Sequence, residues 1–311
     1  MTREVSVAVF PTPPEALVER LLRYHQPYSL PLARRLQFTN QPGGITDYSR
    51  ILFASTEPLA ATAGDDTRIP FAAAYLDLSR APDTEMWVYS SIERQQRLPS
   101  EEEDEEETSC AISLFQQVKR ECAVYFASTQ KKRDKVLIGT LNENLRERLP
   151  ARTGVELKTI WDKWIFRSDL LPDVKLPELL GEEGRRWYFD TVRKEDVAFA
   201  ISRSHIPRQD TALYLDEGTP IAWAFLGPDS SIMTLYCEEA YRNQGIAKAV
   251  IVKTLRDRLN IFGDNGPQTY GWADVAPDNV QSQGVCRGLR GEVSWRVSWS
   301  WLDLEKVSPE K

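Results

Sequence analysis

The sequence is poor in the residues that hold metal ions and form disulfides. Among its 311 residues are only two histidines and four cysteines. Cys110, Cys122, Cys237 and Cys286 stand far apart and show no metal-ligand spacing. We therefore expect neither a zinc site nor a disulfide framework, and no metal cofactor. Unpaired cysteines are typical of reducing compartments, so a cytoplasmic location is the expectation.

Long apolar runs and an excess of positive charge are missing as well. The apolar run near the amino terminus is too short for a signal peptide, and no run reaches the length of a membrane span. Lys and Arg total 39 against 46 Asp and Glu, which gives a net charge of −7. A nucleic-acid surface needs the opposite sign, so neither nucleic acid nor membrane is an expected partner. Hydrophobic residues make up 41% of the chain, as in globular proteins, and the length allows two domains.

The most informative stretch is residues 230–260. An apolar run over 232–236 predicts a strand, and apolar residues at helical spacing over 246–259 predict a helix. In the turn between them, Gly245 and Ala247 lack bulk, so an anion can approach the backbone. The N–H groups of a first helical turn and the helix dipole favour negative charge there. The stretch predicts a phosphate-binding turn, although small residues would also let the helix lie close to its strand.

The wider pattern resembles the GNAT superfamily of acyl-coenzyme A-dependent N-acyltransferases. Its signature, Arg/Gln-x-x-Gly-x-Gly/Ala, is matched by the six residues from Arg242 to Ala247. A second landmark, Asp278-Asn279 with Ser282, follows a strand-like segment, as that superfamily requires. The resemblance covers residues 185–303 and is closest to the glycine N-acyltransferase-like branch.

The order of expected elements suggests an internal repeat. A strand, a helix, a hairpin, a helix and a strand occur twice. We therefore predict an α/β fold with a mixed sheet, and the resemblance implies two tandem GNAT-like lobes. Residues 1–170 form the first lobe, 171–184 a linker, and 185–311 the domain that carries the acyl-CoA site. The alternative is an unrelated first lobe that caps the substrate cleft.

The first predicted lobe has no phosphate turn. Between its hairpin, over 71–79 and 85–92, and the apolar strand 135–141 stand seven consecutive acidic residues, 101–107. Such a run repels itself, so we predict a solvated loop over 100–108. A docking segment for a basic partner is the alternative.

The resemblance implies a site for acetyl-CoA or another acyl-CoA as cosubstrate. In the family, main-chain N–H groups of the fourth strand meet the thioester carbonyl, and the turn and first helical residues hold the diphosphate. An asparagine of the next helix helps to hold the cofactor. The residues implied here are Leu235, Tyr236, Cys237, Arg242, Asn243, Gln244, Gly245, Ile246, Ala247, Lys248, Asn279 and Ser282.

The family's leaving-group acid, a tyrosine seven residues after the landmark asparagine, is replaced here by Cys286. A thiol can donate a proton, because its ordinary pKa of about 8.5 is close to that of the coenzyme A thiol class. Cys286 is therefore a candidate acid, although free cysteines more often behave as small buried apolar residues. Tyr236 and Tyr270 are other phenols that can serve.

Two residues are candidate bases. His205 has a suitable ordinary pKa and follows the helix that, in the family, borders the acceptor site, but a surface histidine is equally consistent. Asp274 stands within an otherwise apolar strand segment, where it faces either solvent or a cleft. Glu238 and Glu239, just past the cofactor strand, are weaker candidates.

These features together predict an N-acyltransferase that moves an acetyl or other short acyl group directly to a small amine or amino acid. A binding module that has lost the chemistry is the alternative from another class, because the usual tyrosine is replaced at Cys286. A protein lysine acetyltransferase would need an open peptide groove. We expect a monomer or a weak homodimer, because tandem lobes already supply lobe-to-lobe packing.

Overall fold

The computed structural model describes residues 4–59, 69–94, 101–179, 184–197, 211–215, 217–263 and 268–308. The chain divides into two compact units, Met1–Trp161 with Trp295–Lys311, and Asp162–Ser294. In the described ranges, no helix is long and apolar enough to cross a membrane. The same residues contain no group of three or more His, Cys, Asp or Glu side chains that could hold a metal ion.

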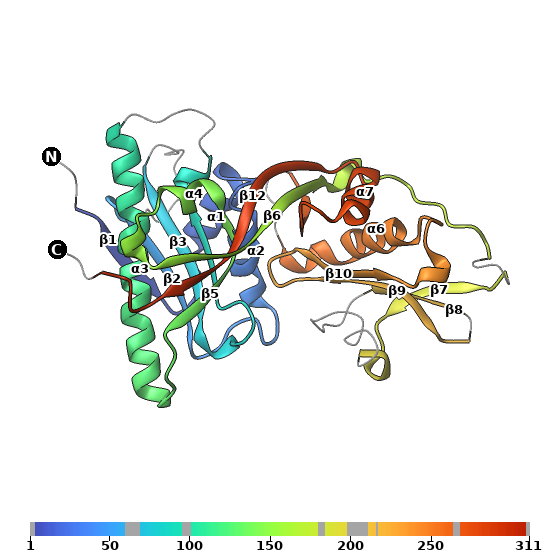
Figure 1. Ribbon diagram of the computed structural model, residues 1–311, viewed down its shortest axis with the longest axis horizontal. Helices are drawn as coiled ribbons and strands as arrows, with labels where there is room; N and C mark the ends of the chain where they lie inside the picture. The colour runs from blue at the N-terminus through green and yellow to red at the C-terminus, as the bar shows by residue number, and fades with distance from the viewer. Residues whose placement is uncertain are drawn as a thin grey trace. The chain divides into compact units, whose positions relative to one another are not determined.

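The first unit is built on a mixed sheet (Figure 1). Four strands follow one another as antiparallel neighbours, and a fifth pairs in parallel with the fourth at Met86 and Ile138. The predicted hairpin and the apolar strand that follows it are thus confirmed. The strands are β1 (Ser6–Phe10), β2 (Ser49–Ser55), β3 (Phe71–Asp77), β4 (Met86–Ser90) and β5 (Lys135–Asn142).

Helices cover both faces of this sheet. Leu52 and Ala74 lie in a core with α3 (Glu101–Thr129), while Ile51 and Ala73 lie in a core with the two helices that follow β1. Successive strand residues point to opposite faces, so the two cores are separate layers. The remaining helices of this half of the chain are α1 (Glu15–Tyr24), α2 (Leu30–Gln37) and α4 (Glu143–Arg148), with 3-10 turns η1 (Phe38–Asn40), η2 (Leu78–Arg80), η3 (Ser91–Arg94) and η4 (Ala151–Thr153).

The acidic run does not form a loop. Residues 101–107, predicted as solvated chain, are the first turns of α3. Glutamate is a good helix former, and negative side chains are favoured at a helix amino terminus because they meet the positive end of the dipole. Helix propensity and the dipole therefore outweigh the mutual repulsion that suggested a loop. The acidic residues thus form the start of the helix that follows β4.

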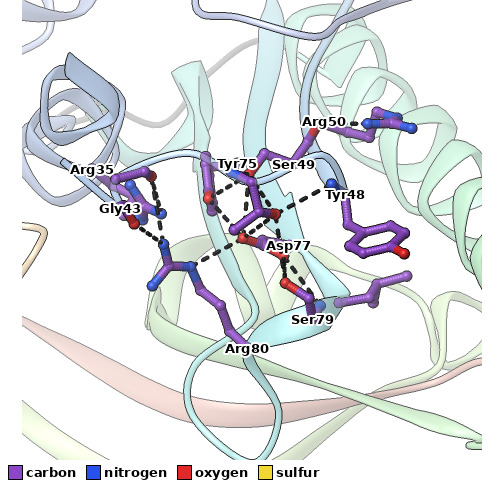
Figure 2. Close-up of polar contacts among 12 residues, drawn as sticks. Arg35, Gly43, Tyr48, Ser49, Arg50, Tyr75, Asp77, Ser79 and Arg80 are labelled. Carbon is purple, nitrogen blue, oxygen red and sulfur yellow. Dashed lines mark hydrogen bonds and ion pairs between the residues drawn. The ribbon is translucent and has the colours of Figure 1, made fainter. Parts of the chain in front are cut away.

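A buried carboxylate fixes the loop before β2 in the first unit (Figure 2). Asp77 Oδ2 accepts from Thr46 Oγ1 at 3.0 Å and Tyr75 Oη at 3.1 Å, while Oδ1 accepts from Ser79 Oγ at 2.6 Å. Arg80 Nε lies 3.1 Å from Oδ2. Burial alone would raise the pKa of Asp77, but hydrogen bonds from Ser79 and the Arg80 charge outweigh it and lower the pKa. This fully engaged carboxylate is structural.

The second unit contains a four-stranded antiparallel sheet in the order β10-β9-β8-β7. Helix α6 covers one face with buried Val250 and Leu255. Strands β8 and β9 form an antiparallel hairpin, with Gly218 at φ 89° in its turn. The strands are β7 (Trp187–Thr191), β8 (Thr211–Leu215), β9 (Pro220–Leu226) and β10 (Ile232–Cys237); the helices are α6 (Ile246–Arg258) and α7 (Val280–Gly288), with 3-10 turns η5 (Ser168–Leu170), η6 (Glu239–Tyr241) and η7 (Leu259–Phe262).

The last strand of each half of the sequence pairs with strands of the unit that the other half mainly forms. Strand β11 (Tyr270–Val275) pairs with the carboxyl-terminal part of β6 (Val155–Arg167), and β5 pairs with β12 (Glu292–Asp303). The predicted boundary at 171–184 is therefore not where the compact units divide. Residues 295–311, assigned to the second domain, belong to the first unit. Backbone ladders decide this assignment, and sequence order does not reveal which ladders form.

Candidate functional site

The site begins where β10 and β11 part. The two strands are joined by one parallel bridge between Ser231 and Trp272, and beyond it they belong to different sheets. Trp272 Nε1 donates to the Asp229 carbonyl oxygen at 2.9 Å and fixes this end. Strand β10 is the edge strand of its sheet, with β9 as its ladder partner. Beyond the bridge, its other edge is thus free of a strand ladder within the described residues.

A bulge interrupts the ladder between β10 and β9. The pairing with β9 shifts between Met233 and Tyr236, and Thr234 has a positive φ of 56°. A bulge turns one residue's N–H out of its ladder, so a main-chain donor can face the opening between the strands. The side chains of Leu235, Tyr236 and Cys237 are half-buried. The Tyr236 ring stacks on the buried Trp223 ring with centroids 5.0 Å apart.

The predicted strand–turn–helix is confirmed after β10. Arg242 Nε donates to the Cys237 carbonyl oxygen at 3.0 Å and closes the turn. Asn243 and Gly245 have φ angles of 63° and 82°, and Gly245 is the N-cap of α6. The first helical bond runs from Ala249 N–H to the Gly245 carbonyl oxygen at 3.1 Å. The N–H groups of residues 246–248 precede that bond and point out of the helix end.

Gly245 is required by its backbone conformation more than by space. A Cβ added there would meet Val174 Cγ1 and Leu176 Cδ2 at 3.8 Å, which is ordinary contact. A positive φ costs a non-glycine residue roughly 1–2 kcal/mol. Among the predicted contact residues, Ile246 is 1% exposed and packs inward, so its main chain is the part that a ligand can reach.

Helix α7 approaches the start of α6. A Cβ at Gly288 would lie 2.7 Å from Lys248 Cδ, so the lysine stem lies against the end of α7. At the other end, Asn279 Oδ1 accepts from Ser282 N–H at 3.0 Å and caps the helix. The second landmark thus has a structural explanation of its own. Its predicted part in cofactor binding stays a prediction.

Asp274 is tied into an ion pair. Its Oδ1 lies 2.7 Å from Lys163 Nζ on the neighbouring strand β6, and the lysine side chain is fully buried. The ammonium also lies 3.3 Å from the centroid of the Trp272 ring. The carboxylate is 13% exposed and stands two residues beyond the bridge to β10. Sequence reasoning found Asp274 but missed Lys163, whose only signal was a lysine between the aromatic residues Trp161 and Trp164 near the strand end.

The other candidate catalytic residues lie in different surroundings. Cys286 is 4% exposed, and burial raises its thiol pKa to about 12. A thiol in this state is a packing residue and a poor proton donor. Burial also raises the pKa of Tyr270, while its hydroxyl donates to Gln268. His205 lies outside the described residues.

Comparisons with known proteins place the chain in a family. A family model described as the N-terminal domain of the acyl-CoA N-acyltransferase verG matches residues 4–169, more than half of the chain. The chain belongs to this family. The family match covers the first half of the chain, while the predicted phosphate turn, residues 242–247, lies in the other half. A search of the curated proteins found no match.

Solved structures agree on the fold of this GNAT protein. A Drosophila protein matches with a TM-score of 0.58 and 13% identity, over 96% of this chain and 99% of that one. A tandem GNAT protein from the clavulanic acid biosynthesis pathway, solved without AcCoA, matches with a TM-score of 0.50 and 10% identity, over 99% and 100%. Together with the acyl-CoA N-acyltransferase family match, these structures confirm the predicted GNAT superfamily and the two-lobe mixed α/β fold. The glycine N-acyltransferase-like branch stays a prediction.

Proposed function

We propose that the protein transfers an acetyl or other short acyl group from acyl-CoA to a small amine or amino acid by direct attack. The single observation that carries the proposal is that β10 parts from β11 after the Ser231–Trp272 bridge and then leads into the glycine-capped start of α6. An edge strand with a bulge and a helix amino terminus offer main-chain donors to two parts of one ligand.

Each set of donors has one task. The turn and first-turn N–H groups of residues 243–248 would hold the diphosphate, and the Lys248 ammonium adds positive charge beside them. The main chain at residues 235–237 would polarise the thioester carbonyl, because a developing negative charge on its oxygen is stabilised by fixed N–H dipoles. Acyl-CoA supplies an activated acyl group when it is bound.

The proton transfers need two side chains. The acceptor nitrogen forms the new bond to the acyl carbon as the carbon–sulfur bond breaks, and it gives up one proton. Asp274 is our candidate to take that proton, directly or through water, with Lys163 fixing the carboxylate in place. Tyr236 replaces Cys286 as the candidate donor to the departing thiolate, because its side chain is half-buried on the strand that borders the opening.

A second function is favoured by two observations. Cys286 is buried where the family has its acid, and Asp274 is already paired. A GNAT-fold module that binds acyl-CoA without transferring the acyl group would show both features. The two functions differ in one outcome, release of free thiol.

Calorimetry with acetyl-CoA, followed by a thiol-release assay against a panel of amines and amino acids, separates these functions. Heat on titration with amine-dependent thiol release supports the transferase. Heat on titration with acetyl-CoA, but no thiol release with any acceptor, supports the binding module. No heat with acetyl-CoA or longer acyl-CoA thioesters refutes both.

A further inference from the structure

Residues 171–176 pass from the carboxyl-terminal part of α6 to the predicted phosphate turn. In the last turn of α6, Arg256 Nη2 lies 2.9 Å from Asp173 Oδ1 and 3.4 Å from the Leu171 carbonyl oxygen. At the helix start, Val174 and Leu176 stand beside Gly245. Asp173 thus meets the end of α6, and the residues that follow it, Val174 and Leu176, meet its start. The segment therefore lies antiparallel to α6.

A second tether holds the far end. Trp187 Nε1 of β7 donates to the Pro177 carbonyl oxygen at 2.8 Å. Residues 172–177, which we name the strap, are thus fastened on both sides of the point where they pass Gly245. Pro172 and Pro177 fix two backbone φ angles and lower the entropy cost of holding this extended path.

The strap presents the wrong chemistry to a diphosphate. The atoms that it places beside the phosphate turn are methyl groups of Val174 and Leu176, at 3.8 Å from the Gly245 Cβ position. A diphosphate needs its oxygens hydrated or paired with N–H groups, and apolar contact removes water without replacing its hydrogen bonds. The side chains that cover this corner therefore oppose the ligand that the turn is built to hold.

We propose that the strap closes over the phosphate turn and has to lift before a diphosphate-bearing ligand can bind. The proposal rests on the proposed acyl-CoA site. For a ligand that binds only the lifted state, the apparent dissociation constant equals the intrinsic constant divided by the fraction of molecules in that state. Loosening the strap therefore tightens binding. The Arg256–Asp173 pair is largely exposed, so its loss changes the equilibrium by no more than about two- to fivefold.

The test compares Asp173→Asn combined with Leu176→Ser against the wild type. As a matched control, Asp257→Asn removes another ion pair of α6, with Lys253 Nζ 2.7 Å away, without touching the strap. In the ligand-free protein, hydrogen exchange of a peptide covering residues 243–248 is expected to rise about tenfold in the double variant and to stay unchanged in the control. Unchanged hydrogen exchange of this peptide in the double variant would overturn the proposal that the strap covers the turn.

Titration with acetyl-CoA gives the second measurement. Several-fold tighter binding by the double variant supports the proposal, whereas equal or weaker binding overturns it, because the strap would then be an inert or integral wall of the site. If neither the wild type nor the variant binds acetyl-CoA, the proposed function fails, and the exchange measurement alone decides whether the strap covers the turn.

Discussion

Lys163 Nζ lies 2.7 Å from Asp274 Oδ1, across the ladder between β6 and β11. The lysine side chain is fully buried, and its ammonium also faces the Trp272 ring. The two residues are 111 positions apart in the chain. A carboxylate that sequence reasoning treats as a candidate base is therefore also the counter-charge of a buried cation.

This pairing predicts a large loss of stability in Asp274→Asn. The substitution leaves the Lys163 ammonium buried without a counter-charge, which typically costs about 3–5 kcal/mol. Adding Lys163→Met should restore most of the free energy of unfolding, because both charges are then gone. Urea unfolding of the single and double variants checks this. A single variant within about 1 kcal/mol of the wild type would show that water already solvates the pair.

The same double variant separates stability from chemistry. If Asp274 takes the acceptor's proton, Lys163→Met with Asp274→Asn stays folded but loses at least about tenfold in kcat, while acetyl-CoA binding is retained. Equal kcat in a stable double variant would remove Asp274 from the reaction.

Gly245→Glu is expected to abolish acetyl-CoA binding. Its carboxylate repels the diphosphate, and its positive φ adds a strain of roughly 1–2 kcal/mol. Gly43→Glu is the matched control, because Gly43 also has a positive φ, 72°, and open space around it, but belongs to the first unit. Calorimetry should show normal acetyl-CoA binding by the Gly43→Glu control, although both variants lose a similar amount of folding stability. Binding by Gly245→Glu would exclude the turn as the diphosphate site.

Cys286→Ala should leave turnover within about twofold of the wild type. The thiol is buried and its pKa is raised to about 12, so it is too weak an acid to protonate a departing thiolate effectively. Tyr236→Phe, in contrast, removes the candidate proton donor and should lower kcat by about tenfold or more. Steady-state kinetics on both variants decides the assignment, and the reverse pattern would return the acid role to Cys286.

His25 predicts a pH dependence of stability. Burial, then the charges of Arg94 and Arg20, lower its pKa from 6.5 to about 3, and its Nδ1 lies 2.9 Å from the Tyr89 hydroxyl oxygen. Between these two pH values the unfolded chain binds a proton that the folded protein does not. Stability therefore falls as pH drops from about 6.5 toward 3, by up to about 1.4 kcal/mol per pH unit from this group.

His25→Gln removes that titration. The stability difference between wild type and variant, from urea unfolding at several pH values, should change across this window and be constant above pH 7. A difference that does not vary with pH would place His25 in contact with solvent.

Many of the strands and turns were predictable from short stretches of the sequence. Apolar runs placed β3, β4 and β5, and the run of small residues at Gly245 and Ala247 placed the turn before α6. These features depend on a few consecutive residues, so propensity and periodicity are sufficient. The acidic start of α3 was also a local feature, and it was missed because repulsion was weighted above helix propensity.

What the sequence by itself determined is the strands β3, β4 and β5, the strand–turn–helix around Gly245 and the GNAT resemblance, since each depends on residues that are neighbours in the chain. Only the tertiary structure decided that β12 joins the first unit, that Asp274 meets Lys163, that Cys286 is buried, and that Val174 and Leu176 cover Gly245. These outcomes depend on contacts between distant residues, which backbone ladders and side-chain packing select and which no local pattern records.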